Sequence, residues 1–341
     1  MSSITGNEDN DQQFVGGSGE KISTKKECTS CEQNDTDAIT EGINSVALQD
    51  GMSTCACCGK EGSSSNMNTC NKCKEVKYCN AACKKKHRSK HKKACQKRVA
   101  ELHEEALFKD HPPNEECPIC VLPLPFDGKV VFQSCCGKRI CDGCVYAMLI
   151  KRREGKDLCA FCRAPNVKTS DEHVKRTEKL IKTGNAYAFN MLANSYANGI
   201  HGLPQNYRKA NELLLKAGEL GCAEAYHNLG VYHSGYGAEV DEKKAKHYWE
   251  LAAMGRNITA RHNLGCIEWN DGNRERGMKH LILAAKAGNK ASLDYVKMFF
   301  TNGLITKDEY AKTLRDYHER QKEMKSDARD KAAAARDQSK F

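Results

Sequence analysis

Apolar positions follow two regimes along the chain, irregular in the first half and periodic from about Thr177 onward. In the second half, apolar and small residues recur at helical spacing. The repeating unit opens on a glycine, and successive glycines are 37, 34 and 33 residues apart, at Gly184, Gly221, Gly255 and Gly288. An apolar residue follows each of them eight or nine positions later, as Leu192, Leu229, Leu264 and Val296. A period of this length predicts stacked helix pairs, an all-α solenoid over residues 178–321.

Small residues and helix caps support the same repeat. Gly184-Asn-Ala186-Tyr-Ala188 recurs as Gly221-Cys-Ala223-Glu-Ala225, and small residues return more loosely as Ala260 and Ala291. Asn206 and Asp241 are expected to cap the second helices of their units. Thr306 and Glu309 predict a capping box for a last helix that ends near residue 325. Residues 326–341 are helix-prone but have no apolar face, so we expect a polar tail that frays.

The segments before the repeat differ in character. Residues 1–52 are polar with few aromatics and cannot bury enough surface to offset ordering entropy, so we expect disorder. Cys28 and Cys31 are expected to be free thiols on this tail. Residues 96–112 carry apolar side chains at helical spacing and end at a proline pair, which predicts a helical linker. The longest apolar run, Val145 to Ile150, is too short to cross a bilayer.

Cysteine is the most informative residue type. Of 20 cysteines, 18 lie before residue 163. A disulfide framework would need a secretory context, and the N-terminus shows no apolar signal segment. Paired Cys-x-x-Cys units in a reducing compartment are typical of zinc sites. We therefore expect about four Zn²⁺ ions per chain, and a cytoplasmic or nuclear location.

The first cysteine cluster occupies residues 55–95. It holds eight candidate ligands, enough for two tetrahedral zinc ions: Cys55, Cys58, Cys70, Cys73, Cys79, Cys83, His91 and Cys95. Few large apolar residues lie between them, and a chain this short needs metal to fold. Cys57 is interpreted as a spare thiol, with an exchange with Cys58 left open.

This spacing, together with the Tyr78-Cys79 pair, resembles the MYND-type zinc finger. The resemblance implies interleaved ligation, with Cys55, Cys58, Cys79 and Cys83 on one ion and the other four residues on the second. It also implies a protein-interaction module that often takes proline-containing peptides. Arg88 stands where the family commonly has a tryptophan, which puts that peptide groove in question.

Residues 72–98 contain twelve Lys or Arg and one acidic residue, Glu75. A solvated helix face, a nuclear signal and a nucleic-acid surface are the three interpretations. No aromatic residues interleave with the basic run to stack bases, so nucleic acid is the least favoured partner. The formal charge is +10. Fifteen thiolates remove fifteen charges and four Zn²⁺ restore eight, which leaves about +3.

The second cysteine cluster lies within residues 115–166. Its eight candidate ligands are Cys117, Cys120, Cys135, Cys136, Cys141, Cys144, Cys159 and Cys162. Gly137 is expected to supply the sharp turn beside the adjacent pair. The intervening apolar residues predict a small strand–strand–helix core: Val130, Val131, Phe132, Ile140, Val145, Met148 and Leu149.

The second cluster resembles a RING finger of the all-cysteine type. The resemblance implies one ion on Cys117, Cys120, Cys141 and Cys144, and another on Cys135, Cys136, Cys159 and Cys162. RING domains of ubiquitin ligases carry no nucleophile and act by orienting a ubiquitin-conjugating enzyme. By resemblance, Ile119, Arg163 and Pro165 match the partner-contacting positions. Their alternatives are a core residue, a solvated charge and a domain terminator. Ala160 and Met148 depart from a frequent proline and tryptophan.

The solenoid resembles Sel-like repeats of the tetratricopeptide type, with an ordinary helical bundle as the alternative. Its aromatics are interpreted as interhelix packing rather than a ligand groove: Tyr187, Tyr196, Tyr226, Tyr232 and Trp249. Cys222 and Cys266 are interpreted as buried thiols. The sequence thus predicts a multidomain protein with two zinc-stabilised cross-brace domains and a solenoid. It is a protein-interaction scaffold, either with RING-type ubiquitin-ligase activity or as a non-catalytic adaptor. A nucleic-acid-associated regulator is the least favoured alternative. Its partners are other proteins, with no membrane.

Overall fold

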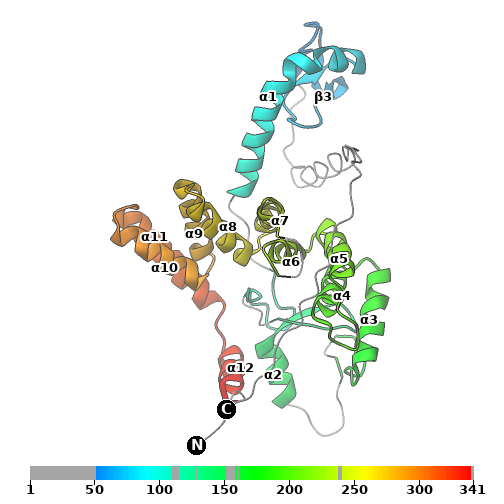
Figure 1. The fold of residues 1–341 in the computed structure, drawn as a ribbon, viewed down its shortest axis with the longest axis vertical. Helices are drawn as coiled ribbons and strands as arrows, with labels where there is room; N and C mark the ends of the chain where they lie inside the picture. Colours follow the sequence, from blue (N-terminus) through cyan, green and yellow to red (C-terminus); the bar gives the residue numbers. More distant parts are fainter. Residues whose placement is uncertain are drawn as a thin grey trace, which may run out of the picture. The chain divides into compact units, whose positions relative to one another are not determined.

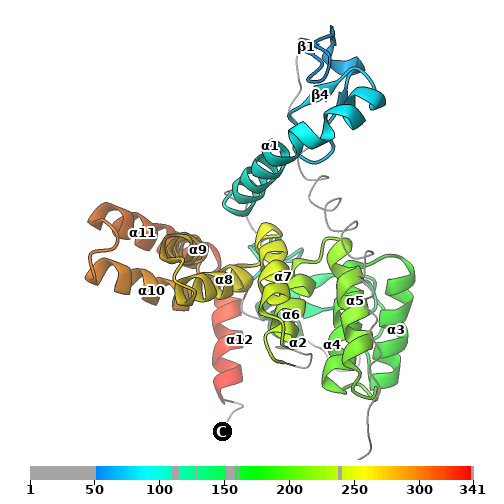
Figure 2. The ribbon, with the colours of Figure 1, turned by 45° about the horizontal axis from the view of Figure 1, so that its top comes forward.

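The computed structural model describes residues 51–109, 115–126, 130–150, 158–159, 161–236 and 240–338. The segment expected to be disordered, 1–52, therefore lies outside the described residues except for its last two, and Met52 opens a strand. Cys28 and Cys31 also lie outside them. Within the described residues, small cysteine-clustered domains precede a helical-repeat region, so the predicted fold class is confirmed (Figures 1 and 2).

The first cysteine cluster combines two short hairpins with one long helix. Strand β1 (Met52–Thr54) pairs antiparallel with β2 (Glu61–Ser63), and β3 (Asn68–Thr69) pairs with β4 (Lys77–Tyr78). A short 3₁₀ turn, η2 (Ser64–Asn66), connects the two hairpins. The chain then enters α1 (Ala81–Leu107).

Helix α1 begins well before the linker predicted at residues 96–112. The Asn80 side chain accepts a hydrogen bond from Cys83 N at 2.8 Å and caps the helix. The basic residues that follow are good helix formers, and their exposure on α1 matches a solvated face. The linker is therefore the last part of a helix that already carries two candidate ligands, His91 and Cys95.

The second cysteine cluster has the predicted strand–strand–helix arrangement. Strand β5 (Val130–Phe132) pairs antiparallel with β6 (Arg139–Cys141), and α2 (Asp142–Ile150) follows directly. Its buried core contains Leu124 and Ile140 together with three cysteines. Two residues expected in this core are exposed instead, Val131 and Leu149. Val131 points to the opposite face of its strand from its neighbours, as the period of two requires.

The helical region is built from consecutive antiparallel pairs. Helix α4 packs on α5, α6 on α7 and α8 on α9, with α3 before them and α10 and α11 after (Figure 1). The bounds are α3 Ser170–Lys182, α4 Ala186–Asn198, α5 Tyr207–Glu219, α6 Ala223–His233, α7 Glu242–Met254, α8 Ile258–Asn270, α9 Arg274–Lys286, α10 Lys290–Thr301 and α11 Lys307–Glu323. The predicted repeat core is confirmed, since Leu192, Leu229, Leu264 and Val296 are all buried.

Helix caps define the register of the repeats. The Asn206 and Asp241 side chains accept from Lys209 N and Lys244 N, so both predicted caps are confirmed. An asparagine one or two positions after three of the repeat glycines caps the first helix of its unit, a regularity not anticipated from the sequence: Asn185, Asn257 and Asn289. In the fourth unit the buried small residue is Ser292, whereas the predicted Ala291 is exposed.

The C-terminal segment is a helix rather than a fraying tail. Helix α12 (Asp327–Gln338) packs against α2, and the two lie side by side in Figures 1 and 2. Ala332 and Arg329 are buried in this contact. The sequence-based expectation was wrong because alanines and the stem of one arginine are enough to form an interface. None of the described helices is long and apolar enough to cross a membrane.

Candidate metal centres

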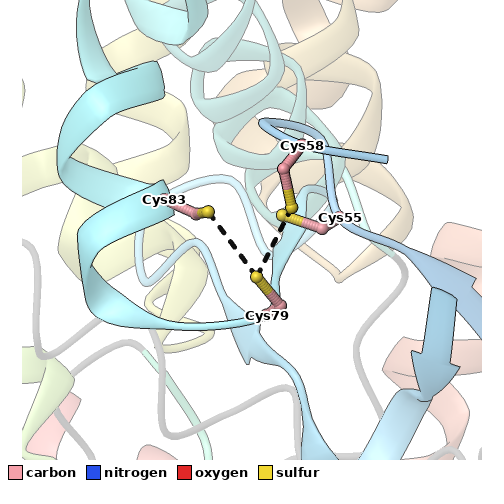
Figure 3. Close-up of side chains that lie close together, drawn as sticks. All are labelled: Cys55, Cys58, Cys79 and Cys83. Atoms are coloured by element: carbon pink, nitrogen blue, oxygen red, sulfur yellow. Dashed lines mark hydrogen bonds between the residues drawn. The ribbon is translucent and has the colours of Figure 1, made fainter. Parts of the chain in front are cut away.

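The first centre joins the loop of the β1–β2 hairpin to the end of β4 and the start of α1. The Sγ atoms of Cys55, Cys58, Cys79 and Cys83 converge on one point (Figure 3). The Cys79 sulfur lies 3.6 Å from that of Cys58 and 3.5 Å from that of Cys83. Cys55 N donates to Lys60 O at 2.9 Å, which closes the loop that presents the first pair. Cys58, rather than the adjacent Cys57, belongs to this group.

The second centre is fully buried and uses one face of α1. His91 and Cys95, four residues apart on the helix, face Cys70 and Cys73 from the preceding loop. The Cys70 and Cys95 sulfurs are 3.7 Å apart, and Cys73 Sγ lies 3.4 Å from His91 Nε2. Tyr78 packs beside this centre with only 1% of its surface exposed.

The remaining two centres interleave in the second cluster. Cys117, Cys120, Cys141 and Cys144 form one group, and Cys135, Cys136, Cys159 and Cys162 form the other. The sulfurs of Cys120 and Cys141 are 3.8 Å apart, and those of Cys136 and Cys159 are also 3.8 Å apart. The turn expected at Gly137 is present, with φ of 72° and its amide donating to Gln133 O at 2.7 Å.

These four groups fit tetrahedral zinc. With Zn–S bonds of about 2.3 Å, two sulfurs on one tetrahedral ion are about 3.8 Å apart, and sulfur to imidazole nitrogen is about 3.6 Å. The observed separations lie at or slightly below these values, and all ligand atoms within a group lie within 4.8 Å of one another. Three cysteines with one histidine, or four cysteines, is the donor set of structural zinc sites.

The thiols in each group need a shared cation. Hydrogen bonds from the backbone near Cys79 lower the pKa of Cys55 to about 6. Burial opposes ionisation of Cys117, yet backbone amides of its own loop bring its pKa to about 7. Burial and the neighbouring thiol of Cys70 raise the pKa of Cys95 to about 12. One thiolate forms readily and further ones repel it, so a divalent ion is what lets all of them ionise.

An arginine from outside the cluster contacts the third centre. Arg329 on α12 donates from Nη2 to Cys120 Sγ at 3.7 Å and from Nη1 to Pro123 O at 2.9 Å. A side-chain Cβ at Gly143 would overlap the Arg329 backbone, so the glycine permits this close approach. A zinc ion with four thiolates carries a net charge of −2, which a guanidinium offsets. Sequence reasoning missed Arg329, because no local motif marks a residue so distant from the cysteines.

The geometry of the first two centres agrees with a known family. Residues 55–95 match the model of the MYND finger. The MYND finger is a zinc-binding domain, and the match covers all eight ligand candidates of the first cluster. Three further segments, residues 186–222, 223–257 and 260–289, match the Sel1 repeat. The chain therefore carries a zinc-binding MYND finger and a Sel1-repeat module, a class of repeat whose partners are other proteins.

Solved structures similar to part of the chain include three proteins that are each about one fifth identical to it. A Sel1 repeat protein from Oxalobacter formigenes is 18% identical, and the match covers 52% of this chain and 70% of that one with a TM-score of 0.40. A protective antigen of uropathogenic Escherichia coli with an SLR fold is 19% identical over 44% of this chain and 34% of its own, with a TM-score of 0.37. An immunity protein from Pseudomonas aeruginosa is 20% identical over 46% and 60%, with a TM-score of 0.32. No curated protein matches the chain.

The remaining singled-out residues do not belong to the metal groups. Ile119, Arg163 and Pro165 are exposed, the first with 40% of its surface accessible. Cys222 is buried and Cys266 half-buried within the helical region, and neither joins a ligand group. The aromatic side chains named in the solenoid pack in its interior clusters, as expected: Tyr187, Tyr196, Tyr226, Tyr232 and Trp249.

Proposed function

We propose that the second cysteine cluster acts as a RING-type module that docks a ubiquitin-conjugating enzyme, within a scaffold that binds proteins through its MYND finger and solenoid. The observation that carries the proposal is the exposure of the three positions that the RING resemblance assigns to partner contact. Ile119 lies on the first ligand loop. Arg163 directly follows the last candidate ligand, Cys162, and Pro165 lies two residues further on.

Exposed apolar residues around this module support a docking role. Besides Ile119, Val121 is 64% exposed and Ile150 62%. Elsewhere in the described residues, only Met52, Tyr236 and Val240 are exposed to a similar degree. Accessible apolar groups on a module this small favour a protein partner, since their burial on binding lowers the free energy.

In ubiquitin transfer the module would orient the reactants and take no part in bond making or breaking. In the transfer, an acceptor lysine amine attacks the thioester carbonyl, an isopeptide bond forms, and the conjugating enzyme's cysteine leaves as a thiol. Arg163 would hold ubiquitin against the conjugating enzyme by charge-assisted hydrogen bonds, which narrows the reactants to a productive orientation. The module forms no covalent bond, so no catalytic residue is assigned.

A non-catalytic adaptor is the second candidate, and one observation favours it. Met148, which stands near the position of a partner-contacting tryptophan, packs half-buried against the cluster core instead. A module without that contact still binds proteins but holds a conjugating enzyme less firmly. Under either function, we propose a cytoplasmic or nuclear location, where thiols stay reduced and available to zinc.

Autoubiquitination with a panel of conjugating enzymes tests the proposal. We expect activity that Arg163→Ala reduces by about tenfold, equivalent to the loss of one charged hydrogen bond. Ile119→Ala should reduce it by about the same factor, because about two buried methylene groups are lost from the apolar contact. Zinc content should stay unchanged, and Arg208→Ala, which removes an exposed arginine from α5, is the matched control. Silence of the wild-type chain across the panel, with its zinc intact, would establish the adaptor.

A further inference from the structure

The C-terminal end of α1 is buried in the solenoid. Leu107, its last residue, is 0% exposed and joins the cluster formed by Trp249 on α7 and Leu264 on α8. Four alanines of the same helices complete this cluster and leave room for the leucine: Ala245, Ala252, Ala253 and Ala260. Phe108 follows and stacks on His280 of α9 with ring centroids 4.6 Å apart.

A buried arginine caps the end of this helix. Arg261 on α8 is 6% exposed and donates from Nη1 to Leu107 O at 3.0 Å, and from Nη2 to Ala253 O at 3.2 Å. The last carbonyls of a helix lack partners and carry the negative end of its dipole. A guanidinium at this point satisfies both requirements, so the surface recognises a helix terminus and not only an apolar side chain.

Next to the site that holds Leu107, a charged network around Arg276 favours an acidic residue at position 104 of α1. Arg276 on α9 forms an ion pair with Glu104, which lies three residues before Leu107. Arg276 also forms ion pairs with Glu268, 2.9 Å away and 1% exposed, and with Glu250 at 2.8 Å, and these pairs fix the orientation of its guanidinium. Because the guanidinium is already oriented, little rotamer entropy is lost when a carboxylate binds it.

We propose that the surface between α7, α8 and α9 is a binding site for the end of a helix with a glutamate three positions before a terminal leucine. Its occupant in this chain is the end of α1, which also carries the first cysteine cluster. The site lies in the solenoid and does not depend on ligase activity.

A labelled peptide of residues 96–109 tests this site in the full-length chain. In wild-type protein the tethered helix end competes at an effective concentration near the millimolar range, so peptide binding should be weak. In Leu107→Asp the pocket is vacated, because a buried carboxylate is disfavoured there. We expect fluorescence anisotropy to show at least about tenfold tighter peptide binding to this variant than to the wild type.

Peptide variants separate recognition from nonspecific adhesion. Glu104→Ala and Leu107→Asp peptides should lose binding to the vacated chain, whereas Glu105→Ala, which changes the neighbouring exposed residue, should keep it. Should Leu107→Asp disturb folding by circular dichroism or zinc content, the milder pair Glu104→Ala with Phe108→Ala replaces it. Equal peptide affinity for wild type and the vacated chain, or equal binding of the Glu104→Ala and Glu105→Ala peptides, would overturn the proposal.

Discussion

His280 is a histidine without a hydrogen-bond partner within the part of the chain that the structure describes, and its side chain is fully buried. Burial, together with the nearby cations Arg261, Arg276 and Lys246, lowers its pKa from the ordinary 6.5 to about 3. The residue is therefore neutral in the fold at any pH near neutrality. Its ring packs against the ring of Phe108, and it does not act as an acid or base.

This histidine should make the solenoid sensitive to acid. Between pH 6.5 and about 3 the unfolded chain binds a proton at this residue and the folded chain does not, so stability falls as the pH is lowered through that window. His280→Leu removes this contribution. We expect the pH slope of the unfolding free energy, measured with urea from pH 6.5 to 5, to decrease by up to about 1.4 kcal/mol per pH unit. An unchanged slope in His280→Leu would contradict the assignment.

At the same scale, the grouping of the candidate metal ligands could be predicted from the sequence, whereas the residues that contact these groups from outside could not. Sixteen cysteine and histidine positions follow from short spacings, because paired ligands come from one loop or one helical turn. Arg329 and His280 owe their environments to residues far away in the sequence. A single arginine or histidine has no pattern, so only the folded chain shows what it contacts.

Helix-to-helix approach in the solenoid depends on glycines that face bulky side chains. Gly230 on α6 lies against the Trp249 indole of α7, and an added Cβ would overlap that ring. The indole Nε1 donates to His227 O at 3.2 Å, so its position is fixed on two sides. Gly218 faces Tyr226 in the same manner. Interdigitation at these points sets the spacing between neighbouring helices.

Gly230→Ala tests this packing, because helix propensity and steric overlap predict opposite changes in the free energy of unfolding. Helix propensity alone predicts stabilisation by up to about 1 kcal/mol, because alanine favours a helix interior over glycine. Overlap with a fixed indole predicts destabilisation by about 1–3 kcal/mol instead. We expect the second effect to prevail in thermal and urea unfolding. Lys244→Ala on the exposed face of α7 is the control, and a stabilised Gly230→Ala would mean that the indole shifts at little cost.

Helices with an apolar period were predictable, and helices defined by partners were less so. The repeat region has buried residues every turn, and its helices follow from that period. The start of α1 and the whole of α12 have little apolar signal. The first is organised by ligands at His91 and Cys95, and the second by the surface of α2. Both helices depend on tertiary contacts, and local helix propensity gives no information about such contacts.

For the molecule as a whole, the second cysteine cluster contacts helices of the solenoid as well as α12. Arg139 of β6 forms an ion pair with Glu224 of α6 at 2.7 Å, and its guanidinium lies 4.1 Å from the ring centre of Tyr187 on α4. The second cysteine cluster also contacts α12, which packs on α2 and donates a hydrogen bond from Arg329 to Cys120 Sγ. The solenoid helices α3–α11 have their own interior clusters. Loss of the module should therefore release α12 but leave the repeats folded.

Cys141→Ser tests this linkage, because it leaves one centre with three thiols and removes metal-derived folding energy from the interleaved pair. Elemental analysis should find about four zinc ions in the wild type and about two in the variant, since each cluster binds two. Hydrogen exchange should show lost protection in α2 and α12, whose contacts require the folded module, with protection retained in α4–α9.

Cys57→Ser, which changes a cysteine beside a ligand but outside every group, should keep all four ions. Loss of protection throughout the repeats would mean that the solenoid depends on the module. An unprotected α12 in wild-type protein would show that Arg329 does not hold this helix to the third centre.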